Sequence, residues 1–145
     1  MAPPQQSLSN LPLQVLIFVN SWYDVVYFIL TMALFIWKGS ELPYRGSLGG
    51  LLALEVCLVV VLAILEYCRL FLASRGNKTE THMPLIFSLL LAIPCGIGFM
   101  YYLNFQVYVA RLDIILNCIA LALIGLELFL SLITVLSICR APPKQ

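Results

Sequence analysis

Four long apolar runs leave this chain few ways to fold. They cover about residues 12–37, 48–73, 83–103 and 111–139. A helix needs roughly 20 apolar residues to cross about 30 Å of hydrocarbon. Backbone in lipid must also satisfy its own hydrogen bonds, which helices do within one segment. The runs therefore predict an all-α fold, an integral membrane four-helix bundle, formed as a single transmembrane domain over residues 1–145.

The composition agrees with a protein that works in lipid. Hydrophobic residues make up 62% of the chain and charged residues 10%, and the mean hydropathy is +1.00, outside the usage of ordinary soluble domains. The polar segments between the runs are too short to form a folded aqueous domain. A net charge of only +1, without a basic patch, argues against a nucleic-acid partner, so membrane lipid is the expected surrounding.

Residues at the ends of the runs predict where the helices begin and end. Asn10 is a candidate cap for the first helix and Lys38 its expected end. Gly76 is the expected stop of the second helix, and the pair Pro142 and Pro143 should prevent continuation of the fourth. The third and fourth runs are separated by the segment 104–111, which interfacial tyrosines flank.

The distribution of basic residues predicts an orientation. The side with both termini and the middle loop carries five Lys or Arg residues: Arg69, Arg75, Lys78, Arg140 and Lys144. The other side carries three: Lys38, Arg45 and Arg111. Positive charge favours the cytoplasm, so both termini are expected there. The acceptor pattern at Asn77 would then carry no glycan, because glycosylation occurs on the opposite side.

The remaining reactive residue types do not suggest an enzyme. The five cysteines lie in or at the ends of the runs and imply no disulfide framework. Cys68 and Cys139 lie near the predicted membrane boundary, where they could be palmitoylated or simply pack as small apolar side chains. His82 is the only histidine and is expected in a loop. We therefore predict no catalytic residue, no metal site and no cofactor.

The fourth run carries a polar stripe. Steps of four and three, which keep residues on one helical face, connect Asp113, Asn117, Ala120, Ile124, Glu127, Ser131 and Thr134. An ionisable group near the bilayer centre costs roughly 2.5 to 3.5 kcal/mol when it faces lipid. The stripe is therefore expected to face the other helices.

The other runs offer counterparts to the stripe. The polar candidates are Asn20 and Asp24 in the first run and Glu55 and Glu66, nearly aligned, in the second. In the third run Ser88, Ala92 and Gly96 repeat at four, a spacing that lets helix backbones approach closely.

The charges of these polar candidates do not balance along the sequence. Arg69 follows Glu66 by three residues and is expected to pair with it near the cytoplasmic edge. No Lys or Arg lies clearly beside Asp24, Glu55 or Glu127, so these acids are expected to be protonated or shared in hydrogen bonds. In that state they would stabilise helix packing modestly, by about 0.6 kcal/mol each.

Two functions are compatible with these residues. The first is a scaffold whose polar faces fix how its own helices pack. The second is a small proton-coupled transporter that uses one membrane-embedded carboxylate, for which Asp24 is the candidate. The pattern around Asp24 is not that of the smallest multidrug exporters, and the other acids are spread over several runs. The scaffold is the better interpretation.

Several stretches resemble a known family. They are PLQVLIFVNSWYDVVYFI (12–29), ELPY (41–44), LEYCRLFLASRGN (65–77), MPL (83–85) and YYLNFQVYVARLDIILN (101–117). In this order and spacing the chain is similar to the family of small tetraspan proteins that includes transmembrane proteins 216, 80 and 17. Glu66, Arg69, Phe71 and the pair Gly76-Asn77 match the family pattern at the end of the second helix, whereas Ala73 replaces its usual Gly.

The resemblance implies a cellular place and partners. It implies residence in the ciliary transition zone, in a complex with tectonic proteins, meckelin, B9-domain proteins and other small tetraspans. It also implies support for cilium assembly and for the barrier that controls ciliary membrane composition, without catalytic residues. We therefore expect a non-enzymatic membrane scaffold subunit, whose oligomeric state stays open.

Overall fold

The computed structural model describes residues 8–43 and 46–140 and contains four helices. They are α1 (Leu11–Glu41), α2 (Ser47–Thr79), α3 (His82–Asn104) and α4 (Arg111–Arg140). Each is long and apolar enough to cross a membrane, and the described residues contain no strand. The predicted all-α fold of four membrane-spanning helices is confirmed, and the chain is a multi-pass membrane protein.

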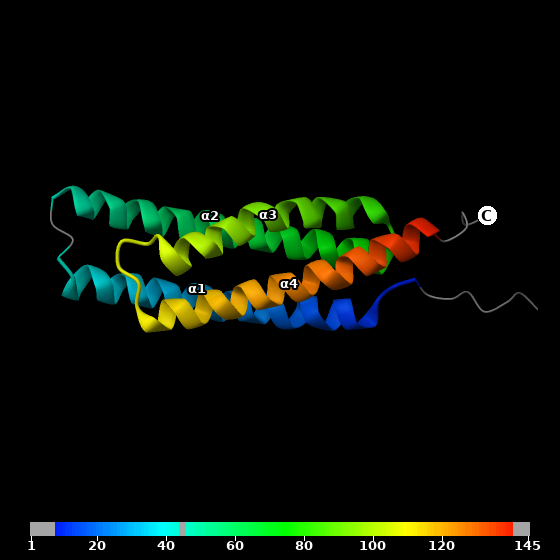
Figure 1. Cartoon of the computed structure of the whole chain (residues 1–145), viewed down its shortest axis with the longest axis horizontal. Helices are drawn as coiled ribbons and strands as arrows, with labels where there is room; N and C mark the ends of the chain where they lie inside the picture. The colour runs from blue at the N-terminus through cyan, green and yellow to red at the C-terminus, as the bar shows by residue number, and fades with distance from the viewer. Residues whose placement is uncertain (1–7, 44–45, 141–145) are drawn as a thin grey trace, which may run out of the picture.

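The helices pack as an antiparallel bundle (Figure 1). α1 lies against α2 and α4, and α3 lies against the same two helices. The described ends of the chain lie at one end of the bundle, together with the connection between α2 and α3 (Figure 1). The connections from α1 to α2 and from α3 to α4 lie at the opposite end. A short connection between successive antiparallel helices is the usual topology of such a bundle.

The helices include the apolar runs predicted for them, but two expected ends were wrong. Lys38 does not end α1, which continues to Glu41, and the Lys38 carbonyl accepts the amide of Leu42 at 2.9 Å. Gly76 does not end α2 either. That helix continues to Thr79 and ends at Glu80, which has a left-handed φ of 52°.

Each wrong end has a physical reason. The Lys38 side chain is buried beside a carboxylate, so its charge does not need the membrane interface. At Gly76 a Cβ would lie 2.9 Å from the backbone nitrogen of Leu85, so this glycine permits close approach of α3 rather than a helix stop. His82, expected in a loop, is the first residue of α3. Pro142, Pro143, Arg45 and Lys144 lie outside the described residues.

Apolar side chains fill much of the interior of the bundle and also cover its outer surface, as expected for a protein in lipid. The buried apolar core includes Val59, Cys95 and Phe99, each at most 1% exposed. Large apolar side chains such as Phe18 and Phe129 point outward and are more than half exposed. An apolar outer surface is what lipid tails require. All seven residues of the α4 stripe are buried between helices, as their spacing predicted.

The small-residue face of α3 differs from the prediction. The buried residues of α3 are Leu85, Ser88, Ala92, Cys95, Phe99 and Tyr102. Gly96 is not among them, and a Cβ added there would meet nothing within 4 Å. A repeat of four residues drifts by about 40° per step around a helix of 3.6 residues per turn, so the buried face passes from Ala92 to Cys95. The close approach occurs at Gly98, where a Cβ would lie 2.8 Å from Leu62.

Candidate functional site

A buried guanidinium lies at the centre of the polar interior. Arg69 donates from Nε and Nη2 to Oε2 of Glu66 at 3.0 and 2.6 Å, and from Nη1 to Oε2 of Glu127. Arg69 is 2% exposed. The predicted pair of Arg69 with Glu66 is confirmed, and it lies inside the bundle because Arg69 also reaches a carboxylate on α4.

Glu127 has both carboxylate oxygens engaged. Besides the Arg69 contact at Oε2, its Oε1 accepts the side-chain amide of Asn20 at 3.1 Å. The expectation that Glu127 has no basic residue beside it was wrong, because Arg69 lies 58 positions earlier in the chain and only the fold brings it close. Ser88 on α3 donates to the Arg69 carbonyl at 2.9 Å. These contacts join all four helices at one level of the bundle.

A third ion pair lies toward the end of the bundle that holds the α1–α2 and α3–α4 connections. The Lys38 ammonium is 2.5 Å from Oδ2 of Asp113, and both side chains are at most 3% exposed. The same oxygen accepts the Ala110 amide at 2.8 Å. One turn further along α4, Asn117 accepts the hydroxyl of Tyr27 at 3.0 Å. This group fixes α1 against the beginning of α4.

Glu55 holds the connection between α3 and α4. Its Oε1 accepts the amide of Val107 at 2.7 Å and the hydroxyl of Tyr101 at 3.4 Å. Its backbone carbonyl accepts the hydroxyl of Tyr102 at 2.7 Å. Glu55 and Glu66, aligned along α2 by sequence, therefore serve different contacts at different heights of the bundle.

The Asn77 side chain forms two hydrogen bonds with the backbone at the start of α1. Its Oδ1 accepts the Asn10 amide at 2.9 Å, and its Nδ2 donates to the Asn10 carbonyl at 2.9 Å. Asn77 is 0% exposed, so the acceptor nitrogen of the glycosylation pattern is inaccessible in the folded protein. Asn10 in turn caps α1 by accepting the Leu13 amide at 3.4 Å and donates to Thr134 at 3.2 Å.

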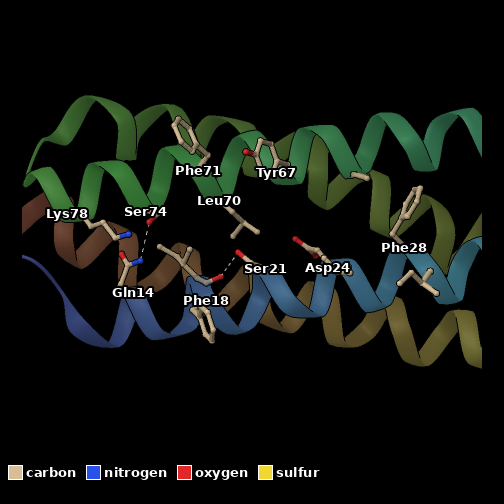
Figure 2. Close-up of a pocket in the computed structure, with 14 residues that line it drawn as sticks. Gln14, Phe18, Ser21, Asp24, Phe28, Tyr67, Leu70, Phe71, Ser74 and Lys78 are labelled. Carbon is tan, nitrogen blue, oxygen red and sulfur yellow. Dashed lines mark hydrogen bonds between the residues drawn. The ribbon is translucent and has the colours of Figure 1, made fainter.

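Asp24 differs from the other acids because it faces a groove. The groove lies between α1 and α2 and has a volume of about 510 Å³; Figure 2 shows Asp24 between its polar end at Gln14 and Ser74 and its apolar end at Phe28. Oδ2 of Asp24 is buried and has no hydrogen-bond partner among the described residues. Among the interior polar residues predicted from the sequence, Asp24 alone lines this groove, and its side chain is partly exposed.

The described residues do not gather conventional ligands for a metal. No group of three or more His, Cys, Asp or Glu side chains within residues 8–43 and 46–140 could hold a metal ion. Cys95 is buried, and the exposed thiols of Cys57, Cys68, Cys118 and Cys139 are free. The chemistry that the arrangement supports is hydrogen bonding and ion pairing between helices.

Sequence reasoning missed two kinds of polar contact. It treated Lys38 as a helix end and did not use Tyr27 or Tyr102. A signal was present in α1, where Asn20, Tyr27, Thr31 and Lys38 are all buried and follow helical spacing on one face. A basic residue in register with buried polar residues is better interpreted as an interior ion-pair partner than as the end of a span.

Comparison with known proteins identifies the family. A family described as "Predicted membrane protein" matches residues 15–124. Transmembrane protein 216 of Homo sapiens is 39% identical over 140 residues, which are 97% of this chain and 94% of that protein. The protein of the same name from Mus musculus is 40% identical over 134 residues, covering 92% of this chain and 93% of that protein.

A more distant relative shows similar coverage. Transmembrane protein 216 of Danio rerio is 36% identical over 137 residues, which are 94% of this chain and 84% of that protein. No solved structure matches the chain. The family match and the relatives together cover all four helices, and the chain therefore belongs to the family of membrane proteins that includes transmembrane protein 216.

Proposed function

We propose that this protein is a non-enzymatic scaffold subunit of the membrane complex at the ciliary transition zone. In this role it supports cilium assembly and the barrier to diffusion in the ciliary membrane. The family resemblance supports the location. One observation carries the scaffold role. Arg69 and Lys38 both form buried ion pairs between helices, so these charges hold the bundle together instead of binding a substrate.

The arrangement of polar and apolar residues suits a scaffold. Buried ion pairs need good geometry and further hydrogen bonds to offset their desolvation, so a bundle that contains several has few alternative packings. A rigid bundle offers fixed helix faces and short loops to its neighbours. The proposed neighbours are tectonic proteins, meckelin, B9-domain proteins and other small tetraspans.

We further propose that both termini lie in the cytoplasm. Arg69 and Lys38 are buried within the bundle and no longer count as loop charges. The end of the bundle with the termini then keeps four of the basic residues and the opposite end keeps two, which retains the positive bias toward the terminal side. Epitope tags at either terminus should become accessible only after the plasma membrane is permeabilised. Staining of intact cells would reverse the orientation.

Proximity labelling in ciliated cells tests the location. A labelling enzyme fused to the chain should biotinylate tectonic proteins, meckelin and B9-domain proteins at the cilium base. The control is the same enzyme on an unrelated four-helix plasma-membrane protein expressed at the same level. Cells without the protein should form fewer cilia or lose exclusion of plasma-membrane proteins from the cilium. Normal cilia with an intact barrier would contradict the proposal.

A proton-coupled transporter is the second candidate, and the groove at Asp24 is the observation that favours it. Purified protein in proteoliposomes would be tested for proton or cationic-dye flux under a pH gradient. Transport predicts flux that Asp24→Asn abolishes and that Glu41→Gln, a change at the exposed end of α1, leaves intact. Scaffolding predicts no flux above empty liposomes.

A further inference from the structure

The groove between α1 and α2 has the size of a binding site. Its volume of about 510 Å³ lies within the roughly 300 to 1,000 Å³ typical of ligand pockets. Phe18 and Phe28 of α1 and Tyr67 and Phe71 of α2 line it. Of these aromatic side chains, Figure 2 shows Tyr67 and Phe28 nearest to Asp24, with Phe18 and Phe71 further along α1 and α2 toward Gln14 and Ser74. The groove therefore combines apolar walls around one acidic group with a polar end at Gln14, Ser74 and Lys78.

A second carboxylate adjoins Asp24. A small cavity of about 10 Å³ is lined by both Asp24 and Glu66, so Asp24 borders this cavity as well as the groove. Oε1 of Glu66 is buried without a hydrogen-bond partner among the described residues, as is Oδ2 of Asp24. Glu66 itself is 2% exposed. Two adjacent carboxylates thus each retain an unused oxygen.

The basic group nearest to these acids is already occupied. Asp24, Glu66 and Glu127 bring three carboxylates to one level of the bundle, whereas Arg69 brings one guanidinium. The Arg69 donors are directed at Glu66 and Glu127. An intramembrane acid without a partner is costly and normally pairs with a basic group. At this level the described carboxylates therefore outnumber the basic groups.

The described basic residues do not offer a balancing positive charge at the level of Asp24. Lys38 and Arg69 are buried in ion pairs. The other Lys and Arg residues that the structure describes are Arg75, Lys78, Arg111 and Arg140, and all lie near helix ends. Lys78 lines the polar end of the groove, twelve residues along α2 from Glu66 and therefore well away from Asp24. A lipid tail carries no charge at this depth. A basic partner for Asp24 would therefore come from a different molecule.

We propose that the α1–α2 groove receives a transmembrane helix of another membrane protein, one that carries a single Lys or Arg near the middle of its span. Its positive charge would pair with Asp24, while its apolar neighbours pack on Phe18 and Phe71. A long basic side chain can bury its aliphatic stem along such walls, and Tyr67 offers an aromatic face for the cation. The inference rests on the proposed scaffold function, because it names the chemistry of one partner.

Two synthetic transmembrane helices test the inference. They are identical Leu- and Ala-rich peptides that differ only in a central Lys or Leu. The full chain, in bicelles, carries a photo-crosslinking amino acid either at position 71 in the groove or at position 129 on the far side, where Phe129 is 62% exposed. The Lys peptide should crosslink at position 71 about tenfold more than the Leu peptide. At position 129 the two peptides should be equal.

Variants of the acid complete the test. Asp24→Asn should lower crosslinking of the Lys peptide at position 71 by about tenfold. Asp24→Glu, which keeps the carboxylate, should retain most of it, and Glu41→Gln should leave it unchanged. Circular dichroism and equal crosslinking at position 129 show that each variant is folded. Retention of crosslinking in folded Asp24→Asn would overturn the inference.

Other outcomes also decide against it. Equal capture of both peptides at position 71 would mean that the groove does not select a charge. Capture of a photoactivatable phospholipid in place of either peptide would make the groove a lipid site. If proximity labelling finds the protein at the transition zone while the Lys peptide is not selected, only the docking inference fails. If the protein is absent from that zone, the proposed function fails whatever the peptides show.

Discussion

Arg69 of α2 and Glu127 of α4 form an ion pair between helices that lie diagonally across the bundle. Each helix packs mainly on its two neighbours in the order α1, α2, α3, α4 and back to α1, so α2 and α4 are not adjacent. Both side chains are 2% exposed. The pair therefore connects two helices that apolar packing alone leaves apart.

Loss of this guanidinium should destabilise the protein strongly. Arg69→Met leaves Glu66 and Glu127 buried without their basic partner, and removal of one member of a buried pair costs about 3 to 5 kcal/mol. The free energy of unfolding in bicelles measures the loss. Arg111→Met, at the exposed start of α4, is the control and should change it by less than about 0.5 kcal/mol. Equal effects of the two changes would contradict the role of Arg69.

Lys38 and Asp113 should be energetically coupled. A double-mutant cycle with Lys38→Met and Asp113→Asn should give an interaction energy of about 0.5 to 3 kcal/mol, as for residues in direct contact. Unfolding free energies of the wild type, both single variants and the double variant provide the value. Combining Lys38→Met with Arg140→Gln, at the opposite end of the bundle, should give additive effects. Additivity of the Lys38 and Asp113 changes would show that the ion pair does not form.

Gly76 should not tolerate alanine. A Cβ there would lie 2.8 Å from the Leu85 side chain and 2.9 Å from its backbone nitrogen, and such overpacking costs about 1 to 3 kcal/mol. Gly96→Ala and Gly125→Ala are matched controls inside helices, since nothing lies within 4 Å of either added Cβ. They should be neutral or stabilise by up to about 1 kcal/mol, because alanine favours helix over glycine. The thermal unfolding temperatures of the three variants measure the difference. A Gly76→Ala protein as stable as the wild type would show that Gly76 does not lie as close to Leu85 as the structure places it.

Asn77 should act in folding and not in glycosylation. Asn77→Ala removes both hydrogen bonds with Asn10 and should lower the free energy of unfolding by about 1 to 3 kcal/mol. Faster hydrogen exchange at the start of α1 should accompany the loss. Thr79→Ala destroys the same acceptor pattern but alters an exposed hydroxyl, so its stability should be nearly unchanged. Glycosidase should cause no mass shift in the wild type, and a shift that both variants abolish would contradict this assignment.

Some of the site could be predicted from particular residues and some could not. Steps of three and four placed Asp113, Asn117 and Glu127 on one buried face, because helical periodicity alone decides which residues share a side. The same rule failed for Gly96, because a four-residue repeat departs from the true turn of the helix. It also could not find Glu127 as the partner of Arg69, since that contact joins residues 58 positions apart.

By itself the sequence determined that the chain crosses the membrane four times, because the lengths of the apolar runs and the cost of unpaired backbone in lipid depend on composition alone. It also determined which face of α4 turns inward. Only the tertiary structure decided that Lys38 and Arg69 are interior residues and that Asp24 borders a groove. Those outcomes depend on which helices are neighbours and on how far each is shifted along the bundle axis. The periodicity of a single helix carries no information about either.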